Sequence, residues 1–181
     1  NGKPIRKLFL KAPLNYRRIS SGFSRSRIHP IYRVARPHLG VDYAAPTGTP
    51  VVALGNGTVT FKGTSGGFGK SIQITHPAGY VTYYGHLSGY AKGIDKGTRV
   101  SQGEVIGYVG STGVSTGPHL DFRVKHNGKF VNPLTLKSVN GPPLKGNSMA
   151  RFKEVSAKRL AMLDDSSLNR TADLGADDVS L

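Results

Sequence analysis

The amino-acid sequence predicts a β-rich protein with a mainly antiparallel sheet or sandwich and one helix near its C-terminus. Short runs rich in β-branched and aromatic residues follow one another at close spacing between residues 41 and 136. The chain has 24 glycines and 11 prolines, which suit turns better than long helices. No clear helical pattern interrupts these runs, so neighbouring strands are expected to pair directly.

Turn residues set the limits of the predicted strands. Residues 51–54 and 58–61 are β-prone runs joined by Gly55-Asn56-Gly57, and Asn-Gly between two such runs is a strong hairpin signal. Asn127-Gly128 gives the same signal later in the chain, and residues 63–69 form a glycine-rich loop. Further strands are expected at residues 71–75, 80–86, 105–109 and 119–124, with a turn at 76–79.

The chain divides into three parts by composition. Residues 1–18 are a basic lead-in that reads as the remnant of an upstream region, residues 19–137 form the main domain, and residues 138–181 form a C-terminal extension. Residues 23–36 are basic and irregular, which predicts a long loop. Because the chain opens on Asn1 without a methionine, we expect it to be part of a longer protein.

The C-terminal extension predicts one helix and an unstructured tail. Residues 148–163 are rich in helix-forming residues, and four apolar residues lie partly on one face: Phe152, Val155, Leu160 and Leu163. From residue 164 onward the chain is acidic and polar, so we expect disorder there.

The composition restricts the possible functions without choosing between them. Lys plus Arg number 25 and Asp plus Glu 10, and the resulting net charge of +15 attracts anionic polymers. Nucleic acid, an anionic membrane face and an anionic cell-wall polymer all qualify, although no helix-turn-helix, zinc-finger or RNA-binding signature is present. The absence of cysteine excludes thiolate metal ligands and cysteine nucleophiles. We see no signal peptide, and no apolar run approaches the roughly 20 residues that a membrane span needs.

A first cluster of candidate chemical residues lies in the strand predicted at 119–124. The sequence His119-Leu120-Asp121-Phe122 alternates polar and apolar residues. Because side chains two residues apart share one face of a strand, His119 and Asp121 are expected to point the same way. Leu120 and Phe122 are then expected to pack inward.

A second cluster is His38-Leu39-Gly40-Val41-Asp42. A loop that runs into a strand, with Gly40 allowing a bulge, could bring the side chains of His38 and Asp42 to one point. Histidine nitrogen and carboxylate oxygen are both ordinary zinc ligands, and three protein ligands plus water is the catalytic zinc arrangement.

His86 is the third feature. Alternation in the strand predicted at 80–86 places Thr82, Tyr84 and His86 on one face. A neutral imidazole beside a metal site can act as a general base or stabilise an oxyanion.

Each pattern also has a structural explanation, since a single histidine is more often structural or merely exposed than chemical. His29 and His76 each precede a proline and His126 precedes an Asn-Gly turn, which favours turn or surface roles for all three. Residues 69–71 match only the last three positions of a phosphate-binding P-loop and lead into a strand rather than a helix.

Taken together, these motifs resemble the lysostaphin- and LytM-like zinc endopeptidases of peptidase family M23, in particular the Gram-negative periplasmic subgroup. The resemblance covers approximately residues 19–136 and implies a sheet of the duplicated hybrid motif type, with a groove that holds the metal site. The segments that carry it are residues 18–23, 36–46, 84–88 and 113–122.

The resemblance implies roles for five residues. His38 and Asp42 are expected to be zinc ligands, and His86 and His119 the catalytic histidines that hydrogen-bond the attacking water and the tetrahedral intermediate. The family's third ligand is the second histidine of a His-x-His pair, and this sequence has Asp121 at that position.

Asp121 departs from the family pattern but keeps the chemistry of a ligand, since carboxylate binds zinc. Two carboxylates would leave a zinc site with zero net charge instead of +1, so we expect lower intrinsic activity or a higher pH optimum than in the His-x-His form. The harder ligand set also makes another divalent metal, such as manganese, an alternative to the single zinc ion.

The expected function is zinc-dependent hydrolysis of peptide crosslinks in bacterial peptidoglycan. The alternative is a catalytically weak or inactive wall-binding regulator that activates other hydrolases. Peptidoglycan is the expected partner, together with an N-terminal regulatory region of the full-length chain, and nucleic acid is not expected. The expected location is the periplasm or cell envelope, with the full-length protein secreted or anchored to a membrane.

Overall fold

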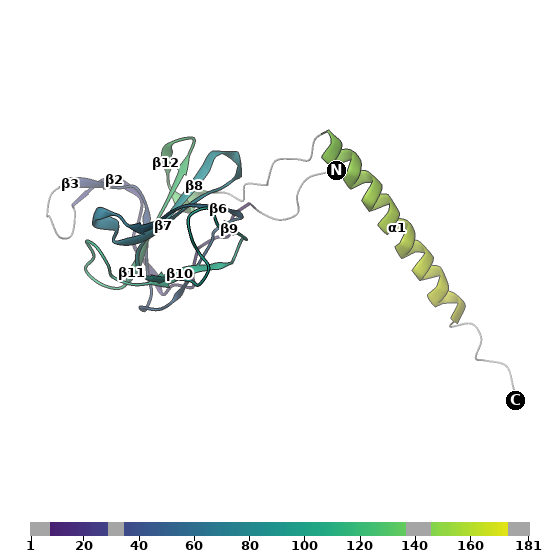
Figure 1. Ribbon diagram of the computed structural model, residues 1–181, viewed down its shortest axis with the longest axis horizontal. Coiled ribbons are helices and arrows are strands. Elements are labelled where there is room, and N and C mark those ends of the chain that lie inside the picture. Colours follow the sequence, from purple (N-terminus) through teal and green to yellow (C-terminus); the bar gives the residue numbers. More distant parts are fainter. Residues whose placement is uncertain (1–7, 29–34, 137–145, 174–181) are drawn as a thin grey trace, which may run out of the picture. The chain divides into compact units, whose positions relative to one another are not determined.

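The computed structural model describes residues 8–28, 35–136 and 146–173. The chain separates into two compact units, Arg6–Gly141 and a smaller one that combines Asn1–Ile5 with Pro142–Leu181. The larger unit holds all the described strands, whereas the described part of the smaller unit is essentially one helix (Figure 1).

Short strands joined by tight turns build the larger unit, and a single long helix follows it in the sequence. The strands are β1 (Arg18–Ser21), β2 (Ser24–Ile28), β3 (Ala35–His38), β4 (Val41–Ala44), β5 (Pro50–Val52), β6 (Gly57–Thr64), β7 (Lys70–Thr75), β8 (Tyr80–Tyr90), β9 (Arg99–Val100), β10 (Val105–Val109), β11 (His119–His126) and β12 (Lys129–Val131). The single-turn 3₁₀ helices are η1 (Gly66–Phe68), η2 (Pro77–Gly79) and η3 (Pro133–Thr135), and the long helix is α1 (Asn147–Asp173).

The main sheet runs in the order β1-β4-β11-β8-β7-β6-β9, with β10 paired to β5 and β8, and β12 paired to β11. Strands β2 and β3 form a separate two-stranded sheet. Every pairing among the described strands is antiparallel. The predicted β-rich, mainly antiparallel fold is therefore confirmed.

Period-two alternation places the core on one face of the central strands. In β11, Leu120, Phe122 and Val124 are at most 1% exposed, as the sequence pattern predicts. Burying each such side chain contributes about 1.5–3 kcal/mol, so the register of β11 is strongly fixed. The same strand therefore presents His119 and Asp121 on its other face.

A buried polar network crosses the core beneath the sheet. The Tyr84 hydroxyl accepts a hydrogen bond from the Leu54 backbone N–H at 2.9 Å and is hydrogen-bonded to the Thr82 hydroxyl at 3.0 Å. The Thr82 hydroxyl also lies 2.7 Å from Nε2 of His76, whose Nδ1 donates to the Asn56 carbonyl at 2.8 Å. His76 begins the predicted turn at 76–79, but it is buried rather than on the surface.

The two Asn-Gly signals have different outcomes. Asn127 and Gly128 have φ values of 48° and 79°, and they join β11 to β12 as the two-residue hairpin that the sequence predicts. Asn56 and Gly57 do not have positive φ, which a type I′ turn requires of both residues. Strand β5 pairs with β10, and β6 pairs with β7 and β9, so the hairpin predicted at Gly55-Asn56-Gly57 is wrong.

Tertiary contacts explain this failure. The Asn56 side-chain oxygen accepts a hydrogen bond from the Gln102 backbone N–H at 2.7 Å, and its carbonyl is bound to His76. A Cβ at Gly55 would lie 2.4 Å from the Leu8 carbonyl oxygen, so this glycine permits a close chain crossing. The segment serves as a junction between distant parts of the chain instead of a local turn.

The sequence prediction of one long loop over residues 23–36 is also wrong. Strand β2 lies within this range and β3 overlaps its end, and the two pair with Ser24 opposite His38. The basic residues are compatible with this ribbon, because a two-stranded sheet needs no continuous apolar run. Residues 29–34 lie outside the described part of the chain.

Helix α1 begins close to its predicted start but continues to Asp173, beyond the predicted end at residue 163. The expected disorder from residue 164 stays a prediction, although the helix is drawn as far as Asp173. The amphipathic pattern ends earlier than the helix, but no proline or glycine interrupts the chain until Gly175. Among the described residues, no helix is both long and apolar enough to cross a membrane.

Candidate metal centre

Two carboxylates lie opposite each other on neighbouring strands. The antiparallel register of β4 and β11 pairs Asp42 directly with Asp121, and Gly85 of β8 is the partner of Asp121 on the other side. Asp42 is 8% exposed and Asp121 4% exposed. Like charges directly opposite in a sheet are destabilising, so this arrangement requires nearby positive charge.

His38 completes the cluster from the end of β3. Its Nε2 lies 2.9 Å from Oδ1 of Asp42 and 4.0 Å from Oδ2 of Asp121. One ligand atom from each of the three residues lies within 4.8 Å of the other two, and all three residues are buried. The structure therefore brings together His38, Asp42 and Asp121, which the sequence analysis selected as metal ligands.

The orientation of the His38 imidazole is fixed by the backbone. Nδ1 lies 2.9 Å from the Gly22 carbonyl oxygen, which can only accept, so Nδ1 carries the proton and donates. The lone pair of the neutral ring is then on Nε2, on the side of the two carboxylates. A hydrogen bond from the ring nitrogen that does not face the metal is typical of metal-binding histidines.

The donor set fits a divalent cation. Nε2 of His38 is buried and makes no hydrogen bond of normal geometry with the described residues, although Asp42 is close to it. Burial alone lowers the pKa of His38, but the close approach and negative charge of Asp42, the Gly22 carbonyl and the charge of Asp121 outweigh burial and raise it. Positive charge is thus favoured between these side chains, and a metal ion would supply it.

The two other histidines selected from the sequence lie together. The ring centroids of His86 and His119 are 4.7 Å apart. Nδ1 of His86 donates to the Thr112 carbonyl at 2.7 Å, and Nδ1 of His119 donates to the Gly117 carbonyl at 2.8 Å. Each neutral ring therefore keeps Nε2 as a proton acceptor, which is what a general base requires.

The loop that holds His86 is itself anchored. The Thr112 hydroxyl donates to the Leu87 carbonyl at 2.8 Å and accepts from the Lys70 backbone N–H at 3.0 Å. These bonds fix the position of the Thr112 carbonyl, which accepts the hydrogen bond from Nδ1 of His86. Burial is the main cause that lowers the pKa of His86, so its imidazole is held in the neutral form.

The prediction that Thr82, Tyr84 and His86 share one face is wrong at His86. Its φ is +61°, which is uncommon for a residue other than glycine, and the pairing of β7 with β8 shifts register between Ile72 and Lys70. Tyr84 and Leu87 are both fully buried although they are three residues apart, so the alternation slips between them. Such backbone strain concentrates at functional sites, and here the slip accompanies the approach of His86 to His119.

Arg123 is a further residue of the cluster, and it was not predicted from the sequence. Its Nε donates to Oδ1 of Asp121 at 2.9 Å and its Nη2 donates to Oδ2 at 2.6 Å. The alternation that grouped His119 with Asp121 also places Arg123 on the same face, two residues further along β11. That signal was present in the sequence.

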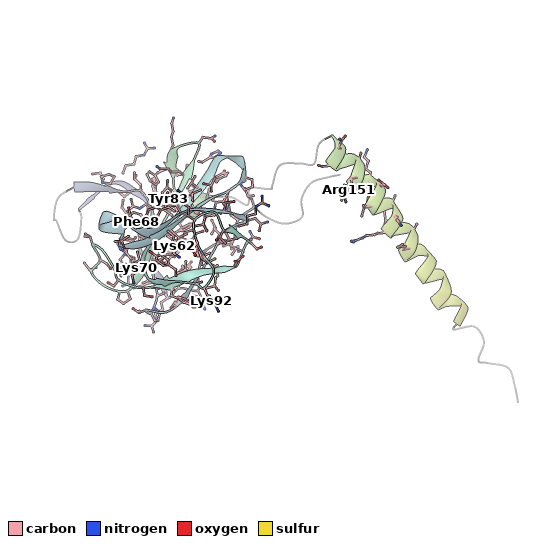
Figure 2. The ribbon with its side chains drawn as sticks, in the orientation of Figure 1. Lys62, Phe68, Lys70, Tyr83, Lys92 and Arg151 are labelled. Carbon is pink, nitrogen blue, oxygen red and sulfur yellow. The ribbon has the colours of Figure 1, made fainter. Side chains whose placement is uncertain are left out.

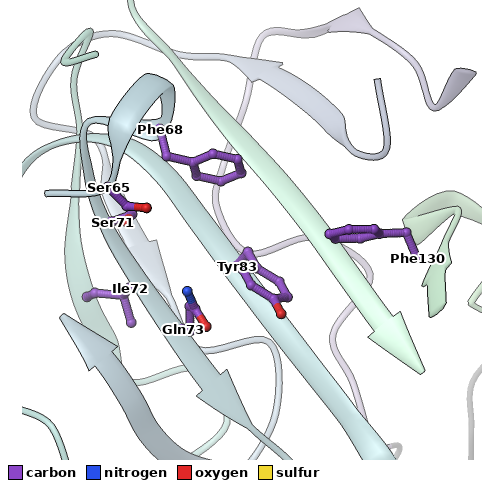
Figure 3. A pocket seen from close by; sticks show the side chains of 7 residues that line it. All are labelled: Ser65, Phe68, Ser71, Ile72, Gln73, Tyr83 and Phe130. Carbon is purple, nitrogen blue, oxygen red and sulfur yellow. The ribbon is translucent and has the colours of Figure 1, made fainter. Parts of the chain in front are cut away.

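A pocket of about 170 Å³ is lined by residues of β7, β8, β12 and the η1 turn, two of which contact or pair with Arg123. Tyr83, the strand partner of Arg123, is one of its walls, and Phe68 stacks against both Arg123 and His86. Figure 2 labels Phe68 and Tyr83 on the strand unit, and Figure 3 shows the pocket from close by. The lining residues are Ser65, Phe68, Ser71, Ile72, Gln73, Tyr83 and Phe130.

The remaining histidines do not join the cluster. His76 belongs to the core network, and His126 stacks on Tyr80 with ring centroids 4.2 Å apart. His29 lies outside the described residues.

The fold and this cluster together define the class of protein. A buried His-Asp-Asp group, beside two histidines whose imidazoles are oriented by backbone carbonyls, is the donor arrangement of a metal-dependent hydrolase.

Comparison with known proteins identifies the family. The sequence model of peptidase family M23 matches residues 36–133. The chain is 47% identical over 151 residues to the DD-carboxypeptidase/endopeptidase Mpg of Neisseria meningitidis, covering 83% of this chain and 34% of that protein. It is 37% identical over 164 residues to the peptidoglycan DD-endopeptidase ShyC of Vibrio cholerae, covering 91% of this chain and 37% of that protein. The chain belongs to peptidase family M23, as its motifs indicate.

Solved structures agree with this assignment. A zinc containing peptidase from Vibrio cholerae superposes with a TM-score of 0.67 at 35% sequence identity, covering 74% of this chain and 41% of that one. The chain spans about a third of the length of the two curated relatives described above.

Proposed function

We propose that this chain is the catalytic domain of a zinc-dependent endopeptidase that hydrolyses peptide crosslinks of bacterial peptidoglycan. The observation that carries the proposal is the convergence of His38, Asp42 and Asp121 within 4.8 Å, at buried positions. The names of the similar proteins support both the reaction and the substrate.

In this proposal His38, Asp42 and Asp121 hold the metal ion. When bound, the ion polarises the scissile carbonyl and activates a water molecule as the nucleophile. Zinc is the proposed ion because a mixed nitrogen and oxygen donor set suits it, and because a similar solved peptidase contains zinc.

His86 and His119 are the proposed catalytic residues. Their protonated Nδ1 atoms are fixed by the Thr112 and Gly117 carbonyls, so each presents Nε2 for proton transfer. A ring that has accepted a proton at Nε2 becomes a cation and can stabilise the negative charge that develops on the substrate oxygen. The 4.7 Å between the two rings allows both to act on one reacting group.

The pocket beside Arg123 is the proposed seat for substrate atoms next to the scissile bond. It is bounded mainly by apolar and aromatic side chains, with Gln73 and Ser71 as hydrogen-bonding groups (Figure 3). Such a mixture suits a peptide segment with short apolar side chains. The net charge of +15 would favour association with an anionic cell wall, which supports a site of action in the periplasm or cell envelope.

The second candidate function is a wall-binding regulator without hydrolytic activity. The specific observation in its favour is that both oxygens of Asp121 are bound by Arg123, which could withdraw this carboxylate from a metal ion.

The experiment that separates the two functions is the turnover of purified crosslinked muropeptide by the zinc-loaded chain, followed by chromatography and mass spectrometry. The proposal expects the crosslinked dimer to be converted into monomers, with loss of the activity on zinc chelation and recovery on zinc addition. A metal-free chain that produces no monomers but stimulates another wall hydrolase would favour the regulator.

A further inference from the structure

Arg123 and Asp121 form a two-point ion pair at the edge of the proposed metal site. Both carboxylate oxygens accept a hydrogen bond from the guanidinium, at 2.9 and 2.6 Å. The Asp121 side chain is 6% exposed and that of Arg123 24% exposed, so water screens the pair only partly. A bidentate arginine–carboxylate pair of this kind fixes the geometry as well as the charge.

The surroundings fit this pair closely. The Arg123 guanidinium carbon lies 4.2 Å from the centroid of the Phe68 ring, which stacks on it from the η1 turn. A Cβ at Gly40 would lie 2.6 Å from Cγ of Arg123 and 2.9 Å from Oδ1 of Asp121. The absence of a side chain at Gly40 therefore leaves the space that the pair occupies.

The ion pair leaves Asp121 able to bind a metal. Each carboxylate oxygen has two lone pairs, and Arg123 uses one on each oxygen. Oδ2 of Asp121 remains 4.0 Å from Nε2 of His38. Arginine binding and metal binding at Asp121 are thus compatible.

The charges can be counted from the residues alone. A zinc ion contributes +2, Asp42 and Asp121 contribute −2, and Arg123 contributes +1, which gives +1. One carboxylate with two neutral histidines around zinc also gives +1. The expectation of an electrically neutral site, drawn from the sequence, counted only the ligands and omitted Arg123.

We propose that Arg123 is a positioning residue that acts through Asp121, so that the Asp121–Arg123 pair replaces a neutral ligand. Since a fixed cation repels a second cation, Arg123 weakens metal binding, but it keeps the loaded site positive. Its removal should therefore tighten zinc binding and slow hydrolysis. A purely structural role would predict that both decline together.

The test is the dissociation constant of zinc, measured by competition with a chromophoric chelator, for wild type, Arg123→Gln and Arg123→Lys. Circular dichroism of each metal-free chain verifies folding. Arg123→Gln should bind zinc more tightly by at least about tenfold, and Arg123→Lys should stay within about threefold of wild type because it keeps the charge. Lys125→Gln is the matched control, since it removes a positive charge from the same face of β11 two residues further on, and its zinc affinity should equal that of wild type.

An Arg123→Gln chain that binds zinc no more tightly than wild type would overturn the inference. An Arg123→Lys chain that binds as tightly as Arg123→Gln would overturn it as well, because the charge would then not be the cause.

The turnover of muropeptide by the zinc-saturated variants is measured separately. This second measurement rests on the proposed function. We expect the Arg123→Gln chain to hydrolyse muropeptide several-fold more slowly than wild type. Turnover equal to wild type would contradict the inference that Arg123 supports hydrolysis. A wild-type chain that turns over nothing would refute the proposed function, while the zinc affinities would still decide the role of Arg123 in metal binding.

Discussion

Asp42 and Asp121 are direct cross-strand partners, one in β4 and one in β11, with their side chains buried on the same face of the sheet. Adjacent buried carboxylates are unfavourable unless cations offset their charge. His38 lies against one carboxylate and Arg123 binds the other. The strand register, fixed by apolar residues on the opposite face, thus brings two negative charges together. A bound metal ion would offset their repulsion.

The first prediction concerns Gly40. Replacement by alanine would force a Cβ to within 2.7 Å of the Phe122 carbonyl oxygen and closer still to Arg123. We expect Gly40→Ala to destabilise the strand unit by about 1–3 kcal/mol, as overpacking does, and to weaken zinc binding because Asp121 must shift. Thermal unfolding and chelator competition measure the two effects. Gly89→Ala is a suitable control, since nothing lies within 4 Å of a Cβ there, and equal behaviour of the two variants would refute the close approach at Gly40.

The second prediction separates catalysis from metal binding. His86→Gln and His119→Gln should each lower muropeptide turnover by about 10²–10⁴-fold, the usual contribution of a general acid or base. Both variants should retain zinc, because neither residue belongs to the cluster of proposed ligands. Metal analysis and turnover are compared on the same preparations. If either variant lost its zinc, that histidine would have to be counted among the ligands.

The third prediction tests the buried network under the sheet. Tyr84→Phe removes the hydroxyl that accepts from the Leu54 backbone N–H, and a buried donor left without a partner costs about 1–3 kcal/mol. The free energy of unfolding in urea should fall by that amount. Tyr108→Phe serves as the control, since Tyr108 is 37% exposed, and its stability should match wild type. An unchanged Tyr84→Phe would show that water or a rearrangement satisfies the Leu54 N–H.

The fourth prediction is a pH dependence of stability from His76. Burial lowers the pKa of His76 below the ordinary histidine value of 6.5, against the opposing hydrogen bond to Asn56. Above pH 6.5 the ring is neutral in both the folded and unfolded chain, so its contribution to the free energy of unfolding is fully present. As the pH falls below 6.5 the unfolded chain takes up the proton first, and stability is lost until the folded pKa is passed.

The measurement is urea unfolding of the metal-free chain between pH 7.5 and 5.5, for wild type and His76→Gln. The variant should be less stable at pH 7.5 but should lose less stability on acidification, since it lacks the buried titrating group. The wild-type slope from one such group is limited to about 1.4 kcal/mol per pH unit. Parallel curves for the two proteins would contradict the assignment to His76.

Much of the strand pattern could be predicted because local rules decide it. Strand β10 has the bounds 105–109 that the sequence predicts, and Asn127-Gly128 forms its hairpin because both residues adopt positive φ. Asn56-Gly57 fails because contacts from residues distant in sequence hold Asn56. A local turn signal cannot take account of such contacts.

The candidate site shows the same division. Alternation alone places His119 and Asp121 on one face. The proximity of His38 to Asp121 depends on the pairing of β4 with β11, and it was predicted only through the family resemblance. The slip at His86 depends on a strained backbone that residue types do not reveal. Arg123 was predictable from alternation, but its importance appears only when its two hydrogen bonds to Asp121 are seen.

The most direct test of the account is the metal content of wild type beside Asp121→Ala, determined by elemental analysis after identical purification and zinc loading. Asp121 is the residue that departs from the family's His-x-His pattern, so the whole site depends on its ability to bind. We predict about one zinc ion per wild-type chain and zinc at background level in a folded Asp121→Ala chain. An Asp121→Ala chain that keeps the wild-type zinc content would contradict the account.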